Sequence, residues 1–193
     1  MAINTQQITL EAFVEQYSDN GPFEFIDGEF IPVPPQVTGS GRMGGELYFL
    51  IKQHIRPDNL GEVFIENPFV ITLDRSQWVT GSRVPDVMFY SAARFKQFTK
   101  AYPDWESIPV VDAPDFVAEI VSPTDRFTKV SSKVARYLND GVMLIWVLDR
   151  QAKSIQVHTQ GSNQITTYSG DVTLSADPVI PGFALDLKRF FSA

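Results

Sequence analysis

Apolar positions recur along the chain in short segments, and their spacing switches between that of a helix and that of a strand. Leu10, Phe13, Val14 and Tyr17 fall on one face of a helix. The hydroxyl of the preceding Thr9 is suited to accept a hydrogen bond from the first helical turn. The pattern therefore predicts a short helix over residues 10–17.

Three further helices are expected. One covers residues 41–55, where Leu47, Leu50, Ile51 and Ile55 form an apolar stripe. Another begins at 124–125, reaches about residue 139 and is closed by Asp140-Gly141, because glycine readily ends a helix. A last helical turn is expected at 187–191.

Strand signals fill most of the remaining chain. Asp27-Gly28 is a strong signal for a two-residue hairpin between residues 23–26 and 29–33. Thr80-Gly81-Ser82 is interpreted as a turn, and residues 97–114, with three prolines, as an irregular surface loop. Further strands are expected at 62–66, 68–73, 84–90, 116–121, 143–148, 154–159, 164–168 and 179–183.

This order of elements favours an α/β (α+β mixed) fold, with a central mixed β-sheet flanked by helices and preceded by an N-terminal helix and β-hairpin. The 193 residues suffice for one domain with a sizeable core, so residues 1–193 are expected to form a single domain.

Composition narrows the function classes. No apolar run is long enough to span a membrane, and the N-terminus lacks the pattern of a secretion signal, which together favour a cytoplasmic protein. The absence of cysteine excludes disulfides, thiolate metal sites and thiol catalysis. The net charge of −7 argues against a general nucleic-acid coating protein, although basic residues outnumber acidic ones within 121–160, so a local basic face remains possible.

The candidate chemistry lies in two carboxylates, Asp86 and Glu119, each of which interrupts an apolar segment expected to be a strand. Ionised carboxylates in a dry setting are costly unless they are paired or coordinated. A divalent ion bound by both would resolve their repulsion, and oxygen ligands suit Mg²⁺ or Mn²⁺. The alternative is structural: Asp86 caps the start of its strand, and Glu119 pairs with Arg83 or with a lysine of the following helix.

That helix carries Lys133 and Tyr137 beside its apolar stripe, which is expected to comprise Phe127, Val130, Val134 and Leu138. A lysine stem at the edge of the stripe can deliver its ammonium to the edge of the sheet. There the charge could stabilise a phosphate that is being cleaved. Lys129 and Arg136 are interpreted as part of a solvated basic face.

These segments resemble the Uma family. The resemblance rests on Phe23–Glu29, Val84-Pro85-Asp86-Val87, Glu119–Pro123, Lys133 with Tyr137, and the spaced series Gly141-Val142, Trp146 and Asp149. The motifs occur in the family's order and cover roughly residues 9–190. The Uma family comprises restriction-endonuclease-like proteins, greatly expanded in cyanobacteria, of the PD-(D/E)xK nuclease superfamily.

The resemblance implies a restriction-endonuclease-like core in which Asp86 and Glu119 are the catalytic, metal-binding carboxylates. The superfamily usually has a lysine two residues after the second acid, where this chain has Val121, and Lys133 is the candidate replacement from another element. An early acidic residue often completes such sites. Among Glu24, Glu29 and Glu46, the last two are preferred here as further catalytic residues.

Two functions remain open. The first is a Mg²⁺-dependent (or Mn²⁺-dependent) endonuclease that hydrolyses DNA phosphodiester bonds. The second is a binding or assembly module that has kept the nuclease scaffold; Arg42 and Leu144, where many relatives carry histidine and glutamate, favour it, as does Val121. The many phenylalanines, among them the pairs Phe95/Phe98 and Phe190/Phe191, further suggest a homodimer.

Overall fold

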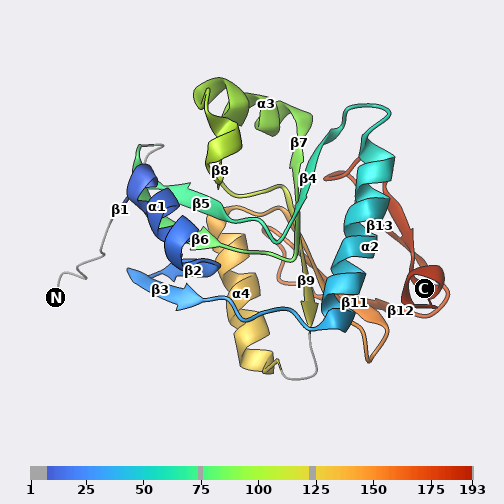
Figure 1. The fold of residues 1–193 in the computed structure, drawn as a ribbon. Coiled ribbons are helices and arrows are strands. Elements are labelled where there is room, and N and C mark those ends of the chain that lie inside the picture. The colour runs from blue at the N-terminus through green and yellow to red at the C-terminus, as the bar shows by residue number, and fades with distance from the viewer. Residues whose placement is uncertain (1–7, 74–75, 122–124, 193) are drawn as a thin grey trace.

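The centre of the molecule is a six-stranded mixed sheet (Figure 1). The computed structural model describes residues 8–73, 76–121 and 125–192. The strands β9 and β10 at the middle of the sheet are parallel, and every other neighbouring pair is antiparallel. In spatial order the sheet contains β12 (Thr166–Ser169), β11 (Ser154–Thr159), β10 (Leu144–Asp149), β9 (Phe116–Val121), β7 (Val87–Ser91) and β4 (Gly61–Ile65).

A second, four-stranded sheet and two hairpins complete the β-structure. The four-stranded sheet has the order β1 (Ile8–Thr9), β6 (Trp78–Arg83), β5 (Phe69–Thr72) and β8 (Val110–Val111). The hairpins are β2 (Phe23–Ile26) with β3 (Glu29–Pro32), and β13 (Thr173–Ser175) with β14 (Ala184–Asp186). The first hairpin is joined to β6, because the backbone N–H of Phe25 donates to the hydroxyl of Ser82 at 2.8 Å.

Helices cover both faces of the central sheet. In Figure 1, α2 and α4 lie on opposite sides of it, and α3 lies at the end of the molecule away from the carboxyl end of β9. None of the helices in the described part of the chain has the length and apolar character that crossing a membrane requires. The helices are α1 (Leu10–Asn20), α2 (Thr38–Ile55), α3 (Ala92–Ala101), α4 (Phe127–Asp140) and α5 (Leu187–Ser192), with a 3₁₀ turn, η2, at Trp105–Ser107.

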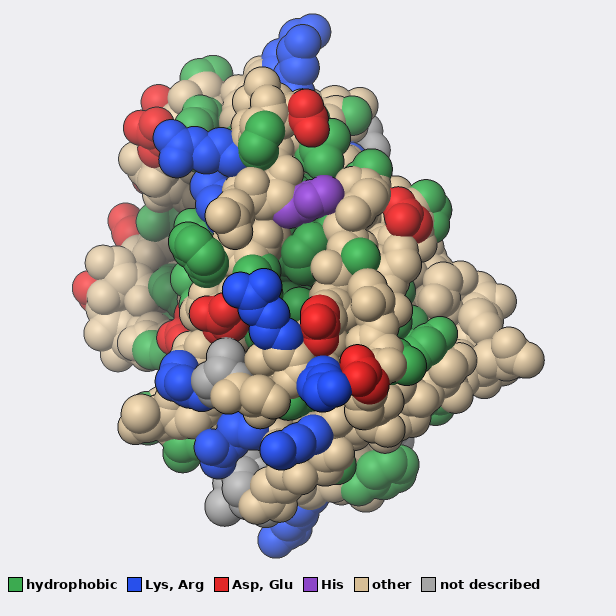
Figure 2. All heavy atoms as spheres, turned by 90° about the vertical axis from the view of Figure 1, so that its right-hand side faces the viewer, with side chains coloured by type: hydrophobic (Ala, Val, Ile, Leu, Met, Phe, Trp, Pro, Cys, Tyr) green, Lys and Arg blue, Asp and Glu red, His purple; other side chains and the backbone are tan. Residues whose placement is uncertain are grey.

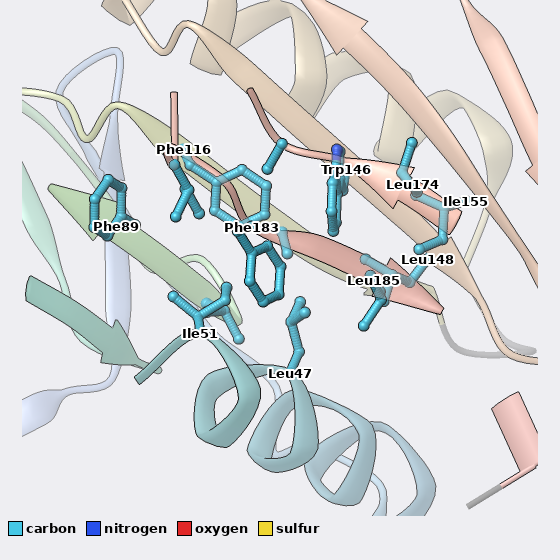
Figure 3. Close-up of a cluster of buried hydrophobic side chains, with 14 of the residues drawn as sticks. Leu47, Ile51, Phe89, Phe116, Trp146, Leu148, Ile155, Leu174, Phe183 and Leu185 are labelled. Carbon is cyan, nitrogen blue, oxygen red and sulfur yellow. The ribbon is translucent and has the colours of Figure 1, made fainter. Parts of the chain in front are cut away.

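The two faces of the sheet bury separate apolar clusters. Leu47 and Ile51 of α2 pack against Phe116 and Trp146 on one face (Figure 3). On the other face, Val134 of α4 packs with side chains of α1, β5 and β6. The sheet is therefore covered on both sides, which explains why its central strands are almost continuously apolar.

The alternation of side chains along β9 positions the candidate chemistry. Phe116, Ala118 and Ile120 point into the cluster under α2. The intervening residues point to the opposite face, where Val117 lies in the α4 cluster. Glu119 belongs to this second set, so the strand presents its carboxylate to α4.

Several predicted elements are confirmed. The Thr9 hydroxyl accepts from the Ala12 N–H at 3.2 Å at the start of α1. Asp27 and Gly28 have the positive φ angles that a two-residue hairpin turn requires, 52° and 87°. Gly141 ends α4 in the left-handed conformation. The strands at 116–121 and 154–159 have the predicted bounds.

Other predictions are wrong. Thr80-Gly81-Ser82 is not a turn but the middle of β6. The packing around Gly81 is tight, since a Cβ would lie 3.1 Å from Nη1 of Arg83 and 3.4 Å from the Phe25 carbonyl. The predicted loop 97–114 contains the second half of α3, followed by η2 and β8. Residues 179–183 are a turn, and the strand lies at β14 instead.

The predicted start of the third helix, at Thr124, lies outside the described residues, as do Ser122 and Pro123 of the motif. Phe127 was expected in the buried stripe of α4 but is 80% exposed. It occupies the first position of the helix, before the turn that packs on the sheet. Val134 and Tyr137 are the buried residues of this helix.

The phenylalanines that suggested a homodimer pack within the monomer. Phe98 and Phe190 are buried. Phe95 contacts the rings of Phe64 and Trp105, and Phe191 packs on Phe190. These contacts remove the observation behind the homodimer, which stays a prediction.

Candidate active site

Glu119 is the centre of a buried polar cluster between β9 and α4. Its Oε2 accepts from the ammonium of Lys133 at 2.7 Å, and its Oε1 accepts from the hydroxyl of Tyr137. Lys133 and Tyr137 are four residues apart on α4 and so share one face of the helix. The ammonium of Lys133 therefore reaches the sheet, as predicted. Its ion pair with Glu119 is also the contact that the structural alternative predicted between Glu119 and a lysine of the helix. Arg83, the other suggested partner, pairs with Asp140 instead.

Asp86 lies beside this cluster, immediately before β7 rather than inside a strand. The antiparallel register that pairs Val87 with Ala118 brings Asp86 opposite Glu119. Its Oδ2 accepts from the backbone N–H of Ile120 at 2.6 Å, and its Oδ1 accepts from the side-chain amide of Gln36. The structure thus brings the two predicted carboxylates together from neighbouring strands.

The environment of Asp86 disfavours its charge. Burial and then the neighbouring charge of Glu119 raise the pKa of Asp86 to about 7, although the Ile120 N–H and Lys133 act in the opposite direction. A carboxyl whose pKa is displaced this far, beside a second carboxylate and on a cavity, marks a candidate functional site. A bound cation would lower this pKa, because it favours the ionised form.

Lys133 keeps its proton. Burial favours the neutral amine, but the negative charges of Glu119 and Glu24 outweigh it, and the pKa of Lys133 is raised. Tyr137 is also protonated, since burial and then the charge of Glu119 raise its pKa well above the usual value. Lys133 is therefore a fixed positive charge and Tyr137 a fixed hydrogen-bond donor, and neither is suited to act as a base near neutral pH.

Among the early glutamates, the structure brings Glu24 to the cluster. Glu24 is buried on β2, its Oε1 accepts from the Val84 N–H at 3.3 Å, and its charge acts on Lys133. The two preferred candidates lie elsewhere. Glu29 is exposed on β3, and Glu46 is exposed on α2, where it lines a different cavity.

Two adjoining cavities open onto the cluster. One, of about 280 Å³, is lined by Asp86, Glu119 and Lys133 together with Gln36 and Glu66. The other, of about 490 Å³, lies between the β2–β3 hairpin and α4, and it shares Glu119 and Lys133 with the first. The carboxylates are therefore accessible from outside while remaining partly shielded from water.

The donor set fits a divalent cation that keeps some of its water. Among the described residues, no group of three or more acidic or histidine side chains is placed to hold a metal. Asp86 and Glu119 supply two carboxylates, which is a usual number for Mg²⁺. Their oxygens accept hydrogen bonds from protein donors and can each accept more. Gln36 lines the same cavity, where its Nε2 donates to Asp86 and so positions one of the two carboxylates.

Of the positions that depart from the family pattern, Val121 lines the larger of the two cavities beside Glu119 and Lys133, whereas Leu144 and Arg42 lie elsewhere. Val121 follows Glu119 on the same face of β9 and packs against the apolar cluster under α4. Leu144 is buried in the cluster under α2. Arg42 lines the same cavity as Glu46. The lysine of this site therefore comes from α4, not from β9.

Sequence reasoning missed Gln36 and Glu66. Gln36 directly follows Pro34-Pro35, and its hydrogen bond to Asp86 joins residues 50 positions apart. Glu66 has a positive φ of 50°, and its N–H donates to the Asp86 carbonyl at 3.1 Å. No periodicity marks either residue, although a glutamate that ends a strand next to a candidate acid could have been considered.

A mixed sheet that carries two carboxylates at neighbouring strands, with a lysine from the covering helix, defines a restriction-endonuclease-like core. Residues 10–188 match the Uma2 family, whose description is "Putative restriction endonuclease", and the chain belongs to this family.

Comparison with solved structures supports the same fold. A crystal structure from Anabaena variabilis, described as a "putative nuclease belonging to DUF820", is similar over 96% of this chain and 98% of its own, with a TM-score of 0.73 and 22% identity. No match was found among the curated proteins.

Proposed function

We propose that this protein is a divalent-metal-dependent endonuclease that hydrolyses DNA phosphodiester bonds at Asp86, Glu119 and Lys133. The observation that carries the proposal is the convergence of these three side chains on one cavity, with a displaced pKa at Asp86. Membership of the Uma2 family supports nuclease chemistry.

Asp86 and Glu119 would hold Mg²⁺ or Mn²⁺, which supplies Lewis-acid polarisation of the scissile phosphate and charge neutralisation. The ammonium of Lys133 faces the same cavity and stabilises negative charge that develops on the phosphate oxygens. Tyr137 fixes the carboxylate of Glu119 through its hydroxyl, and Gln36 and the Ile120 N–H fix that of Asp86. Preorganised groups of this kind need no rearrangement when charge develops.

Glu24 has a supporting role in this proposal. It is buried, and its charge acts on Lys133 without an ion pair between the two among the described residues. It keeps Lys133 protonated, so that the lysine remains a positive charge even if a cation draws Glu119 away from it.

A second candidate is a DNA-binding or assembly module without catalysis. The observation in its favour is that both oxygens of Glu119 are already engaged by protein donors, Lys133 and Tyr137. In such a module the cluster would act as a buried ion pair that orders the fold.

Plasmid cleavage distinguishes the two. Wild-type protein is expected to nick supercoiled DNA in Mg²⁺ or Mn²⁺ and not in EDTA. Glu119→Gln and Lys133→Met are each expected to slow cleavage by about 10²-fold or more, the usual effect of losing one preorganised charge. Glu29→Gln, at an exposed position away from both cavities, is the matched carboxylate control that keeps the wild-type rate, whereas Glu24→Gln slows cleavage.

Cleavage that persists unchanged in both Asp86→Ala and Glu119→Ala would refute the assigned site. DNA binding without cleavage in any divalent metal would favour the module.

A further inference from the structure

A basic cavity lies on the α2 side of the molecule, outside the proposed active site. It has a volume of about 400 Å³ and is lined by residues of α2, of the β10–β11 turn and of α5. Arg42, Arg150 and Lys153 line it, and Glu46 is the carboxylate among its described lining residues. Figure 2 looks at this side and shows lysine and arginine side chains gathered over the lower part of the face. The cavity is therefore locally positive on a chain whose net charge is −7.

Two of its cations have no acidic partner among the described residues. Arg150 and Lys153 are exposed, and neither makes an ion pair with any residue in the ranges 8–73, 76–121 and 125–192. The guanidinium of Arg150 lies directly on the first turn of α2. A Cβ on Gly39 would come within 2.7 Å of Cζ and Nη1 of Arg150, so the glycine makes this approach possible. This approach places a positive charge at the start of α2, at the edge of the cavity.

The cavity adjoins the proposed active site. Gly39 lines the basic cavity, and the next residue, Ser40, lines the cavity of Asp86 and Glu119. Along the sheet, Val147 of β10 pairs with Glu119 of β9, and Arg150 follows three residues later. At roughly 3.3 Å per residue and 4.8 Å between strands, the backbones of Glu119 and Arg150 lie about 11 Å apart.

We propose that Arg150 and Lys153 bind the phosphate backbone of DNA on one side of the scissile phosphate. The inference rests on the proposed nuclease function and adds the surface that holds the substrate. A separation of about 11 Å between the two backbones lies within the span of a few nucleotides of one DNA strand. A phosphate close to the cleaved bond can therefore meet the guanidinium of Arg150, whose planar fork of donors matches phosphate oxygens.

The test is the salt dependence of DNA binding. Full-length protein is titrated onto a fluorescein-labelled 20-base-pair duplex in EDTA, which withholds the divalent cation, and anisotropy is followed from 0.05 to 0.3 M KCl. Each phosphate contact contributes a slope of about −0.9 in log K against log[KCl], or about 8-fold in affinity at 0.1 M. Arg150→Gln/Lys153→Gln is therefore expected to reduce the slope by about 2 and the affinity by up to about 60-fold.

Two controls accompany this variant. Lys96→Gln/Lys100→Gln removes the same charge from exposed positions on α3, at the other end of the sheet, and is expected to leave slope and affinity nearly unchanged. Arg150→Lys keeps a cation in the cavity and is expected to retain the wild-type slope.

The outcomes separate the inference from the proposed function. A wild-type slope in Arg150→Gln/Lys153→Gln, or an equal loss in the α3 control, overturns the inference even if the protein cleaves DNA. A reduced slope in a protein that never cleaves supports the inference and overturns the nuclease. A wild-type protein that does not bind DNA in EDTA overturns the inference, and one that also fails to cleave DNA in Mg²⁺ or Mn²⁺ overturns both.

Discussion

Replacing Asp86 with asparagine removes the carboxyl that most disfavours folding near neutral pH. Burial and the charge of Glu119 raise its pKa from 3.8 to about 7. Between these pH values the folded protein holds a proton that the unfolded chain has released, so this group makes stability fall as pH rises through the interval. At about 1.4 kcal/mol per pH unit, the full loss above pH 7 amounts to about 4 kcal/mol.

The variant can keep the local hydrogen bonds. The carbonyl oxygen of the introduced amide can still accept from the Ile120 N–H. Nε2 of Gln36 faces Asp86 in the wild type, so the Gln36 amide has to turn over before its Oε1 can accept from the introduced NH₂ group. The amide does not ionise between pH 4 and 8. The stability of Asp86→Asn relative to wild type should therefore increase by about 2–3 kcal/mol between pH 4.5 and pH 8, after allowance for relaxation and partial hydration around a group that is not fully buried.

Urea denaturation in EDTA at several pH values measures this difference. Asp58→Asn, at an exposed loop position, is the matched control and should show no such pH trend. A difference between Asp86→Asn and wild type that stays constant from pH 4.5 to 8, or one that turns against the variant as pH rises, would refute the electrostatic account of Asp86.

Two further substitutions probe the carboxylate cluster and the basic cavity. Tyr137→Phe removes a buried donor from the carboxylate of Glu119 and should lower the free energy of unfolding by about 1.5–3 kcal/mol; an unchanged urea midpoint would show that the hydroxyl does not support Glu119. Gly39→Ala should displace the guanidinium of Arg150 and weaken DNA binding several-fold while leaving net charge unchanged. Alanine is also the better helix former, so thermal stability should not fall, and a lower melting temperature would point to a disturbed helix instead.

The elements that the sequence predicted best are those whose pattern is local. Residues 116–121 are apolar except for Glu119, with Pro114 before them and Pro123 after them in the sequence, and they form β9 with the predicted bounds. Lys133 and Tyr137 could be expected near the sheet because helical spacing places them beside the buried Val134. The sequence predicted that Asp86 and Glu119 come together from neighbouring strands. It did not predict which residues of the two strands pair, and this pairing places the two carboxylates opposite each other.

The errors arise where long-range packing overrides the local pattern. Alternation in the first hairpin places Glu24 on the opposite side from Phe23 and Phe25, which in an isolated hairpin would be the solvated side. That side is covered in the folded protein, and all three residues are buried. The strand β6 contains Gly81 and Ser82, typical of turns, because the hairpin packs closely on it and bonds to Ser82. Such contacts, between residues more than 50 positions apart, have no signature in a single sequence.

The central claim is that Asp86 and Glu119 together hold the cation that DNA cleavage requires. Diffraction from crystals soaked in Mn²⁺, recorded where manganese scatters anomalously, tests it most directly. We expect an anomalous peak within coordination distance of carboxylate oxygens of both residues, absent from crystals of Glu119→Gln treated in the same way. A peak elsewhere, or none between these two carboxylates at millimolar Mn²⁺, would contradict the claim.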